Sequence, residues 1–294
     1  MFIKRDHRKV EEILLSDSEA KVEELLLSKR KAEFSHNINI LCKESMLTAM
    51  SHLKLLNLYD NSLQSLTGID MLQYTPIEEI NLGMNELTSL PTEFGQISTL
   101  QVVWLDDNQF ELFPSCLFQL TNLKALRLSN NMLHEVPPMI ESLDRLEILS
   151  LDNNEIIDFP NGLLSLKGLK QLWLRQNKIE TLPHNLSALE SLETFSISSN
   201  RLSSLPDNIW EISKLKCLYI NGNKLTSISL PADPKHEVVI NAANNGILEL
   251  PSELTLLDVK NGVIIHNLVN INLFGNPCVT KGGEKEKKRV EELL

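Results

Sequence analysis

The sequence predicts an α/β solenoid, in which one short repeat recurs along most of the chain and each repeat adds one strand to a parallel sheet. Two observations carry this prediction. Asparagines recur at a nearly constant interval, with one step of 24 residues, six of 23 and one of 22. The hydrophobic positions around each asparagine also recur at fixed offsets, which is typical of repeat architectures. These asparagines are Asn61, Asn85, Asn108, Asn131, Asn154, Asn177, Asn200, Asn223 and Asn245.

Residues 1–52 are expected to form a helical N-terminal cap, because a terminal repeat would otherwise expose its core to water. Apolar residues at helical spacing predict helix over residues 6–33, with a break between Ser16 and Ser18. A separate hairpin that binds a partner is the alternative for this segment.

Residues 53–278 are expected to form about ten repeats. In each repeat, leucines alternate with other residues, as in Leu126 and Leu128, and a period of two predicts a strand with its leucines on one side. A repeat of this length cannot bury its own apolar side. The leucines of stacked repeats must therefore form a continuous core. The asparagine follows the strand, where its amide can pair with backbone groups that would otherwise lack partners.

A hydrophobic residue and a proline follow the asparagine in seven of the repeats. After the proline, apolar residues three positions apart, such as Ile140 and Leu143, predict a short helix or helical turn on the side opposite the strands. Because strands pack more closely than helical segments, we expect the array to curve with its sheet on the concave face. The prolines are Pro91, Pro114, Pro137, Pro160, Pro183, Pro206 and Pro251.

The combined pattern, LxxLxLxxNxLxxLPxxIxxL, resembles that of the leucine-rich-repeat superfamily. The LPxxIxxL continuation is similar to the intracellular Ras-group class, a set of signalling adaptors. The resemblance covers residues 53–278. It implies a right-handed horseshoe whose concave sheet commonly binds protein ligands, with no chemistry of its own.

Three segments depart from the pattern. Residues 231–236 interrupt the leucine–proline continuation that the repeat predicts there. Residues 251–267 lie where the interval between successive asparagines, Asn245 and Asn276, lengthens to 31 residues. We interpret both irregular segments as sequence drift. The alternative is a binding loop on one rim of the repeat array. Residues 279–294 are expected to be a charged, solvated tail, with a short partner-binding helix as the alternative.

Composition indicates an intracellular compartment and excludes some partners. Charges in the first twelve residues interrupt any signal-peptide core, and no long apolar run could span a membrane, so we expect a cytoplasmic protein without membrane insertion. The four scattered cysteines are expected to be reduced thiols. Between residues 35 and 280 the chain carries 15 basic and 27 acidic residues, which disfavours binding of nucleic acid or anionic lipid.

The non-leucine positions of the strands predict which residues line the concave face. Trp, Tyr and Arg are enriched there, as they are at binding hot spots. The carboxylates of Asp106, Asp107 and Asp152 suggest a partner with basic as well as apolar groups. The alternative is that the aromatic side chains stack on one another and only shield the sheet. The predicted protein-binding residues are Trp104, Asp106, Arg127, Asp152, Trp173, Arg175 and Tyr219.

No motif for catalysis, phosphate binding or metal binding appears in the sequence. The histidines fall in different repeats without metal-ligand spacing. Asp106 and Asp107 are adjacent strand-exit residues that point to opposite faces, so they do not form an acid–base pair. We therefore expect no catalytic residue, no metal and no cofactor.

The sequence thus predicts a non-enzymatic intracellular adaptor or scaffold, a monomer that holds another protein on its concave face, such as a component of a small GTPase pathway. One alternative is a regulatory or targeting subunit of a protein phosphatase. Another is the recognition region of a larger enzyme, a kinase or ubiquitin ligase, whose catalytic part is absent from this chain.

Overall fold

The computed structural model describes residues 2–3, 22–34, 38, 41, 48–230, 237–249, 263–266 and 269–279. The chain divides into two compact parts, residues 1–154 and 155–294, called here the N-terminal part and the C-terminal part. The irregular residues 231–236 and 251–262, the tail from residue 280 and most of the predicted N-terminal helix lie outside the described residues.

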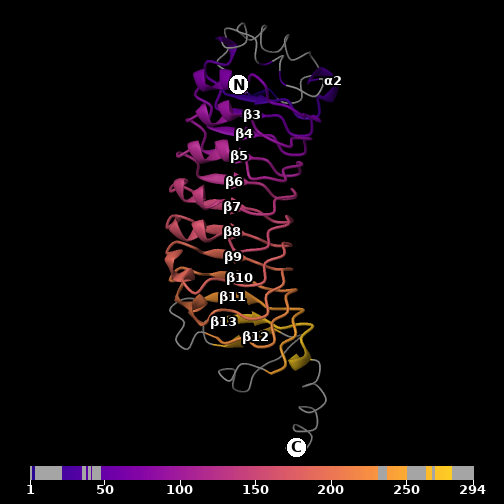
Figure 1. Cartoon of the computed structure of the whole chain (residues 1–294), viewed down its shortest axis with the longest axis vertical. Coiled ribbons are helices and arrows are strands. Elements are labelled where there is room, and N and C mark those ends of the chain that lie inside the picture. Colours follow the sequence, from indigo (N-terminus) through magenta and orange to yellow (C-terminus); the bar gives the residue numbers. More distant parts are fainter. Residues whose placement is uncertain are drawn as a thin grey trace, which may run out of the picture. The chain divides into compact units, whose positions relative to one another are not determined.

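The N-terminal part contains a parallel sheet whose strands lie side by side in chain order (Figure 1). Every described pair of neighbouring strands in this part is parallel and in direct register, so that Asn81, Trp104, Arg127 and Ser150 occupy equivalent positions. The strands are β1 (Phe2–Ile3), β2 (Glu24–Leu26), β3 (Leu55–Asn57), β4 (Glu79–Asn81), β5 (Val102–Trp104), β6 (Ala125–Arg127) and β7 (Ile148–Ser150).

The C-terminal part contains a sheet in the order β8-β9-β10-β11-β13-β12. Its described strand pairs are parallel except the last, in which β12 runs antiparallel to β13. The strands are β8 (Gln171–Trp173), β9 (Thr194–Ser196), β10 (Cys217–Tyr219), β11 (Val238–Asn241), β12 (Val263–His266) and β13 (Val269–Asn272).

In five repeats the helical segment directly after the proline is a short 3₁₀ helix. The four-residue α-helix α2 (Lys31–Phe34) follows Arg30 and not a proline. Proline before the helix fixes an extended backbone, as at Pro91 and Pro137, and 3₁₀ turns are frequent in such short connecting segments. The 3₁₀ helices are η1 (Ile69–Tyr74), η2 (Thr92–Gln96), η3 (Ser115–Gln119), η4 (Pro138–Ser142), η5 (Asn161–Ser165), η6 (Leu186–Ala188) and η7 (Asp207–Glu211).

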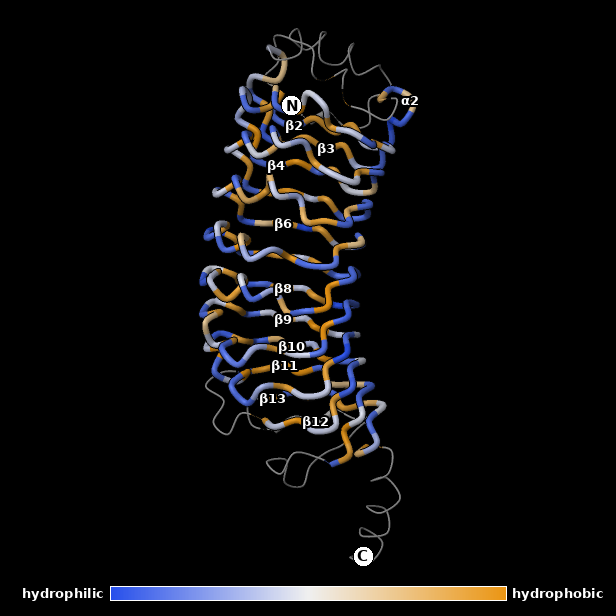
Figure 2. Tube along the Cα trace, viewed as in Figure 1, coloured by the Kyte–Doolittle hydropathy of each residue, from blue (hydrophilic) through white to orange (hydrophobic). Residues whose placement is uncertain are grey.

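The core consists of the repeating leucine positions, as predicted. In β5 and the residue after it, Val103 and Leu105 are fully buried, and each 3₁₀ helix buries at least one apolar residue, such as Leu117. Figure 2 shows hydrophobic residues at corresponding places in successive repeats of each part. The large aliphatic side chains of each repeat thus supply the apolar burial that a single repeat could not provide.

The repeated asparagines form the expected ladder of buried amides. Asn131 illustrates it: its Nδ2 donates to the carbonyls of Leu105 (3.0 Å) and Leu128 (3.1 Å), and its Oδ1 accepts from the backbone N–H of Phe110 (3.1 Å). One amide therefore joins three backbone groups of neighbouring repeats. The residue before the asparagine is left-handed, as at Asn130 (φ 55°) and Asn153 (φ 52°), which turns the chain out of the strand.

The helix predicted over residues 6–33 is wrong for residues 24–26, which form strand β2 in parallel with β3. Leu25 and Leu27 are fully buried and take the two leucine positions of a repeat. Lys29 has the left-handed backbone (φ 63°) that precedes each ladder asparagine, and the backbone N–H of Arg30 donates to Asn61 Oδ1. Residues 22–34 are therefore a repeat that carries Arg30 where the others carry asparagine, and this substitution hid it.

Candidate protein-binding face

The open sheet face is the side of the strands that lies opposite the leucine core. Each strand contributes its first and third residues, and the residue two positions after the strand follows on the same side. In the N-terminal part, this gives Val102, Trp104 and Asp106 from β5, Ala125, Arg127 and Ser129 from β6, and Ile148, Ser150 and Asp152 from β7.

Trp104, Arg127 and Asp106 form one cluster on this face. The guanidinium of Arg127 lies over the Trp104 ring, 5.7 Å from its centroid, and Arg127 Nε lies 2.7 Å from Asp106 Oδ2. The Arg127 side chain is 48% exposed and that of Asp106 only 12%. Arg127 is therefore held from two sides while nearly half of its side chain remains exposed to solvent.

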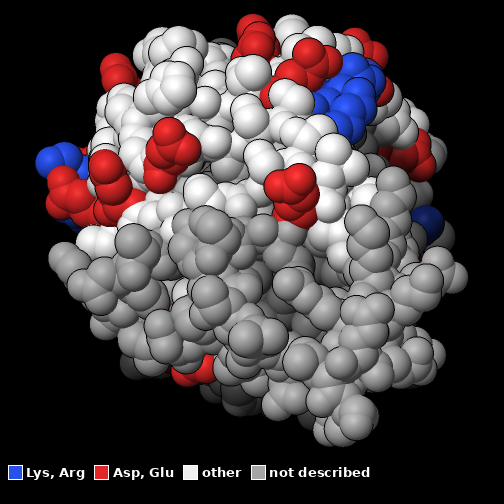
Figure 3. Space-filling model, turned by 90° about the horizontal axis from the view of Figure 1, so that it is seen from below, with Lys and Arg blue, Asp and Glu red and all other residues white. Residues whose placement is uncertain are grey.

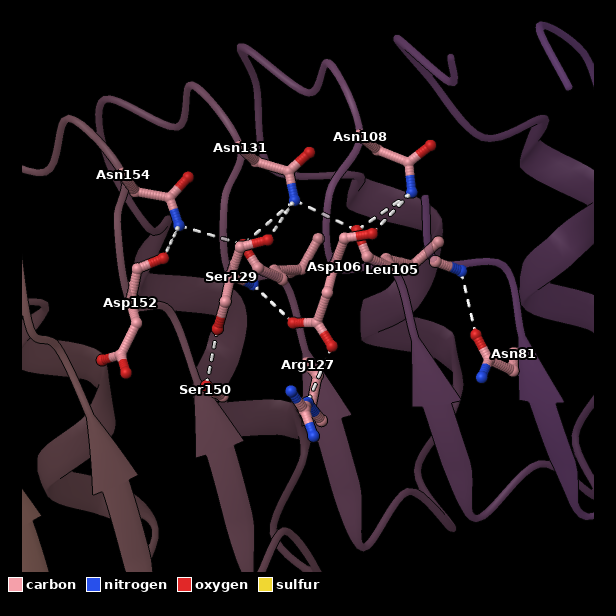
Figure 4. Close-up of polar contacts among 12 residues, drawn as sticks. Asn81, Leu105, Asp106, Asn108, Arg127, Ser129, Asn131, Ser150, Asp152 and Asn154 are labelled. Atoms are coloured by element: carbon pink, nitrogen blue, oxygen red, sulfur yellow. Dashed lines mark hydrogen bonds and ion pairs between the residues drawn. The ribbon is translucent and has the colours of Figure 1, made fainter. Parts of the chain in front are cut away.

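Both carboxylate oxygens of Asp106 already have partners within this cluster (Figure 4). Its Oδ1 accepts from the backbone N–H of Ser129 at 2.8 Å, while Oδ2 pairs with Arg127. Burial raises the pKa of the Asp106 carboxyl; Arg127 and the Ser129 hydrogen bonds oppose this shift, and nearby Asp107 adds to it. Beyond Ser129, the hydroxyls of Ser129 and Ser150 are hydrogen-bonded at 2.7 Å.

An apolar strip lies beside this cluster. Val102, Ala125 and Ile148 are the first residues of β5, β6 and β7; they are in register and partly exposed. The sequence analysis missed this strip because it considered only the later positions of each strand. The signal was present in the sequence, since apolar residues stand at the first strand position in three consecutive repeats.

In the C-terminal part, the rings of Trp173 and Tyr219 stack, with centroids 6.3 Å apart and planes at 18°. Ser196 of β9 lies between them in register, and it is 2% exposed. The two rings thus lean over the intervening strand. This contact corresponds to the shielding alternative of the sequence analysis for these two residues.

The remaining predicted residues lie outside these two contacts. Asp152 is partly exposed and follows β7 on the open face of the N-terminal part, and Arg175 is exposed and follows β8 in the C-terminal part. In the same position of the next repeats, Ser198 Oγ donates to Asn221 Oδ1 at 2.7 Å.

Two hollows lie at the borders of the sheet in the N-terminal part. One, of about 370 Å³, is polar and lined by residues such as Glu78, Lys124 and Arg145. The other, of about 440 Å³, includes Leu112 and Phe113. Neither includes a predicted binding residue. Among the described residues, no group of His, Cys, Asp and Glu side chains could hold a metal ion.

Surface charge and hydropathy add two observations. Acidic side chains are spread over the described surface in Figure 3, and basic ones occur in fewer places. None of the helices in the described ranges has the length and apolar character needed to cross a bilayer.

Comparisons with known proteins agree on one kind of fold. Two family models described as leucine-rich repeats match residues 144–202 and 122–143. No curated protein sequence matches the chain significantly. A leucine-rich-repeat protein of Leptospira interrogans is 27% identical, with a TM-score of 0.63 over 88% of this chain and 74% of that one.

Two receptor structures are similar in fold alone. The plant peptide hormone receptor RGFR1 in complex with RGF2 is 21% identical, with a TM-score of 0.65 over 89% of this chain and 41% of the receptor. A TLR13–ssRNA13 complex is 22% identical, with a TM-score of 0.67 over 81% of this chain and 35% of that one. This chain therefore spans less than half the length of either receptor.

The fold is that of a leucine-rich-repeat solenoid, as the sequence predicted: short parallel strands, an asparagine ladder and 3₁₀ helices recur with the repeat. The family-model matches and the structural neighbours together support the leucine-rich-repeat superfamily. Domains of this kind typically mediate protein–protein interaction.

Proposed function

We propose that this chain is a non-enzymatic adaptor that holds a protein partner against the open sheet face of its N-terminal part. The contact surface is the Trp104 patch, which we define as Trp104, Arg127, Val102, Ala125 and Ile148. The single observation that carries the proposal is the fixed arrangement of Trp104 and Arg127 beside this apolar strip.

The chemistry of the patch supports this role. Tryptophan and arginine carry much of the energy at protein interfaces, because they bury a large area and still form hydrogen bonds. Arg127 is held by Trp104 and Asp106 before any partner arrives, so little side-chain entropy is lost on binding. Val102, Ala125 and Ile148 leave partly exposed apolar surface that a partner can cover.

The open surface favours a macromolecule over a small molecule, since small ligands are usually enclosed in a pocket. One structural neighbour binds a peptide hormone and another is complexed with RNA. The excess of acidic over basic residues between residues 35 and 280 of this chain opposes a nucleic acid, because phosphates would be repelled. A protein partner is the remaining choice.

The adaptor role and the intracellular Ras-group class depend on the LPxxIxxL continuation of the repeats, and a cytoplasmic location belongs to the same proposal. The pair of Trp173 and Tyr219 is a weaker candidate for a contact, because each ring already covers part of the other and Ser196 beneath them is buried.

Affinity capture from an extract of the source cells, with quantitative mass spectrometry, tests the proposal. The wild-type chain is compared with Trp104→Ala and with the control Tyr74→Ala, which removes an aromatic side chain that is 71% exposed on η1. We expect a partner that Trp104→Ala loses and Tyr74→Ala retains. Equal capture by all three folded proteins would contradict the assignment of the patch.

The identity of the captured protein then discriminates the roles. A small GTPase or a kinase supports the signalling adaptor, whereas a phosphatase catalytic subunit supports a regulatory subunit. Binding to the purified candidate, measured by calorimetry with the same two variants, establishes that the contact is direct.

A further inference from the structure

We infer that the partner of the Trp104 patch presents a carboxylate, from an Asp or Glu side chain, to the guanidinium of Arg127. This inference rests on the proposed function, and it reverses the expectation that Asp106 and its neighbours select a basic partner. It follows from which groups of the cluster are already used and which are left open.

Both oxygens of the Asp106 carboxylate are already paired within the chain. Its two oxygens pair with the Ser129 N–H and with Arg127 Nε, and its side chain is 12% exposed. A cationic group of a partner would have to displace Arg127 from a 2.7 Å ion pair to reach it. Asp106 therefore acts as the internal support of Arg127.

Arg127, in contrast, has N–H donors that remain unpaired within the described part of the chain. Its described contacts are the Trp104 ring and Asp106, the latter through Nε, and these leave the terminal Nη1 and Nη2 groups without a partner among the described residues. With 48% of the side chain exposed, the planar fork of the guanidinium can be reached from solvent. Two parallel N–H donors in this geometry match the two oxygens of a carboxylate.

Neighbouring hydroxyls extend this donor set. Ser150 stands opposite Arg127 in register on β7, and its hydroxyl is paired with that of Ser129 at 2.7 Å. Either hydroxyl can be the donor in this pair; when Ser129 donates, the Ser150 O–H is left to donate to a ligand oxygen. Val102, Ala125 and Ile148 lie on the same face, so an apolar residue near the carboxylate completes the motif.

The net negative charge of the chain does not exclude a carboxylate ligand at Arg127. Repulsion between exposed charges is screened beyond about 8 Å at physiological ionic strength. The Arg127–Asp106 pair is neutral as a whole and presents its positive end outward. A peptide carboxylate is favoured over a phosphate, because a phosphate monoester brings nearly twice the negative charge to an acidic chain.

The test uses a displayed library of random peptides as the probe, selected on the folded full chain. Peptides are sorted by whether Trp104→Ala abolishes their binding, and the Trp104-dependent set is then measured against Arg127→Gln, Asp106→Asn and the double variant Arg127→Gln/Asp106→Asn. The double variant removes both charges together, so Asp106 is not left buried without its partner. Thermal unfolding verifies that each variant is folded.

We expect the Trp104-dependent peptides to be enriched in Asp and Glu beside an apolar residue. Their affinity should fall about tenfold or more in Arg127→Gln and in the double variant, and fall less in Asp106→Asn, which loses the support of the guanidinium but keeps the guanidinium itself. Raising salt from about 0.05 M to about 0.5 M should weaken them little, because screening also relieves the repulsion from the acidic chain.

The outcomes separate the two proposals. If no selected peptide depends on Trp104, the patch is not a binding surface and the proposed function fails together with this inference. If Trp104-dependent peptides are instead rich in Lys and Arg, lose more affinity in Asp106→Asn than in Arg127→Gln, or bind Arg127→Gln unchanged, the patch binds a partner and only the carboxylate inference is overturned. A preference for phosphorylated over acidic peptides would overturn it as well.

Discussion

Arg127 lies between two groups from the neighbouring repeat, with its guanidinium 5.7 Å from the centroid of the Trp104 ring and its Nε 2.7 Å from Asp106 Oδ2. Trp104 ends strand β5, Asp106 follows two positions later on the same face, and Arg127 ends the adjacent strand β6. One arginine thus connects two repeats on the open face, where the leucine core gives no support.

The two faces of a strand should respond differently to truncation. Leu172→Ala is expected to lower the free energy of unfolding by about 2 to 5 kcal/mol, because Leu172 is fully buried and its loss leaves a cavity. Trp173→Ala, at the next position of β8 on the open face, should cost less, since the ring packs mainly on Tyr219. Urea denaturation followed by circular dichroism measures both, and comparable losses would contradict the assigned faces.

The ladder predicts a large cost for removing a single amide. Asn131→Ala should destabilise the fold by about 2 to 4 kcal/mol, because the carbonyls of Leu105 and Leu128 and the N–H of Phe110 lose a buried partner. The control Asn161→Ala removes the same atoms from an exposed position of η5 and should change stability by less than about 0.5 kcal/mol. Equal midpoints in a thermal melt of the two variants would be inconsistent with this role.

The left-handed residue before each asparagine predicts substitutions of opposite sign. Met84 has φ 54°, where other repeats carry asparagine, as at Asn130 and Asn153. Met84→Asn should therefore stabilise the fold by about 0.5 to 1 kcal/mol. Gly222→Ala should destabilise it by about 1 to 2 kcal/mol, because φ is 69° and the new Cβ would lie 3.2 Å from Ser199 Oγ. Scanning calorimetry that gave both changes the same sign would refute this account.

Thiol chemistry should distinguish Cys116 from Cys217. Burial raises the pKa of the Cys116 thiol to about 11, so at pH 8 it holds about a hundredfold less thiolate than a thiol with a pKa of 9.0. We expect iodoacetamide to modify the partly exposed Cys217 first, as measured by peptide mass spectrometry. Equal rates for the two sites in the folded chain would contradict the burial of Cys116.

The same shift sets the sign of a pH dependence. Because the folded state raises the pKa of Cys116 above 9.0, it binds this proton more tightly than the unfolded chain does, so this contribution to stability falls as pH rises from about 9 to about 11. Cys116→Val should remove that part of the alkaline loss, which a comparison of urea midpoints at about pH 8 and about pH 10.5 would detect. Parallel losses in both proteins would argue against it.

The sequence by itself determined the solenoid, its leucine core and its asparagine ladder. The reason is that each depends on a period: alternation assigns a residue to the core or to the open face, and the spacing of asparagines aligns one repeat with the next. Periodicity also placed Trp104, Arg127, Trp173 and Tyr219 on the open face. It failed for residues 22–34, where Arg30 replaces the asparagine that marks a repeat.

Only the tertiary structure decided which side chains of that face contact one another. Asp106 reads as an exposed acid in the sequence, yet it is buried against Arg127 and Ser129 of the adjacent repeat. Trp173 and Tyr219 are 46 positions apart in the chain, yet their rings stack. Such contacts depend on side-chain rotamers and on the spacing of neighbouring strands, which a repeat period does not specify.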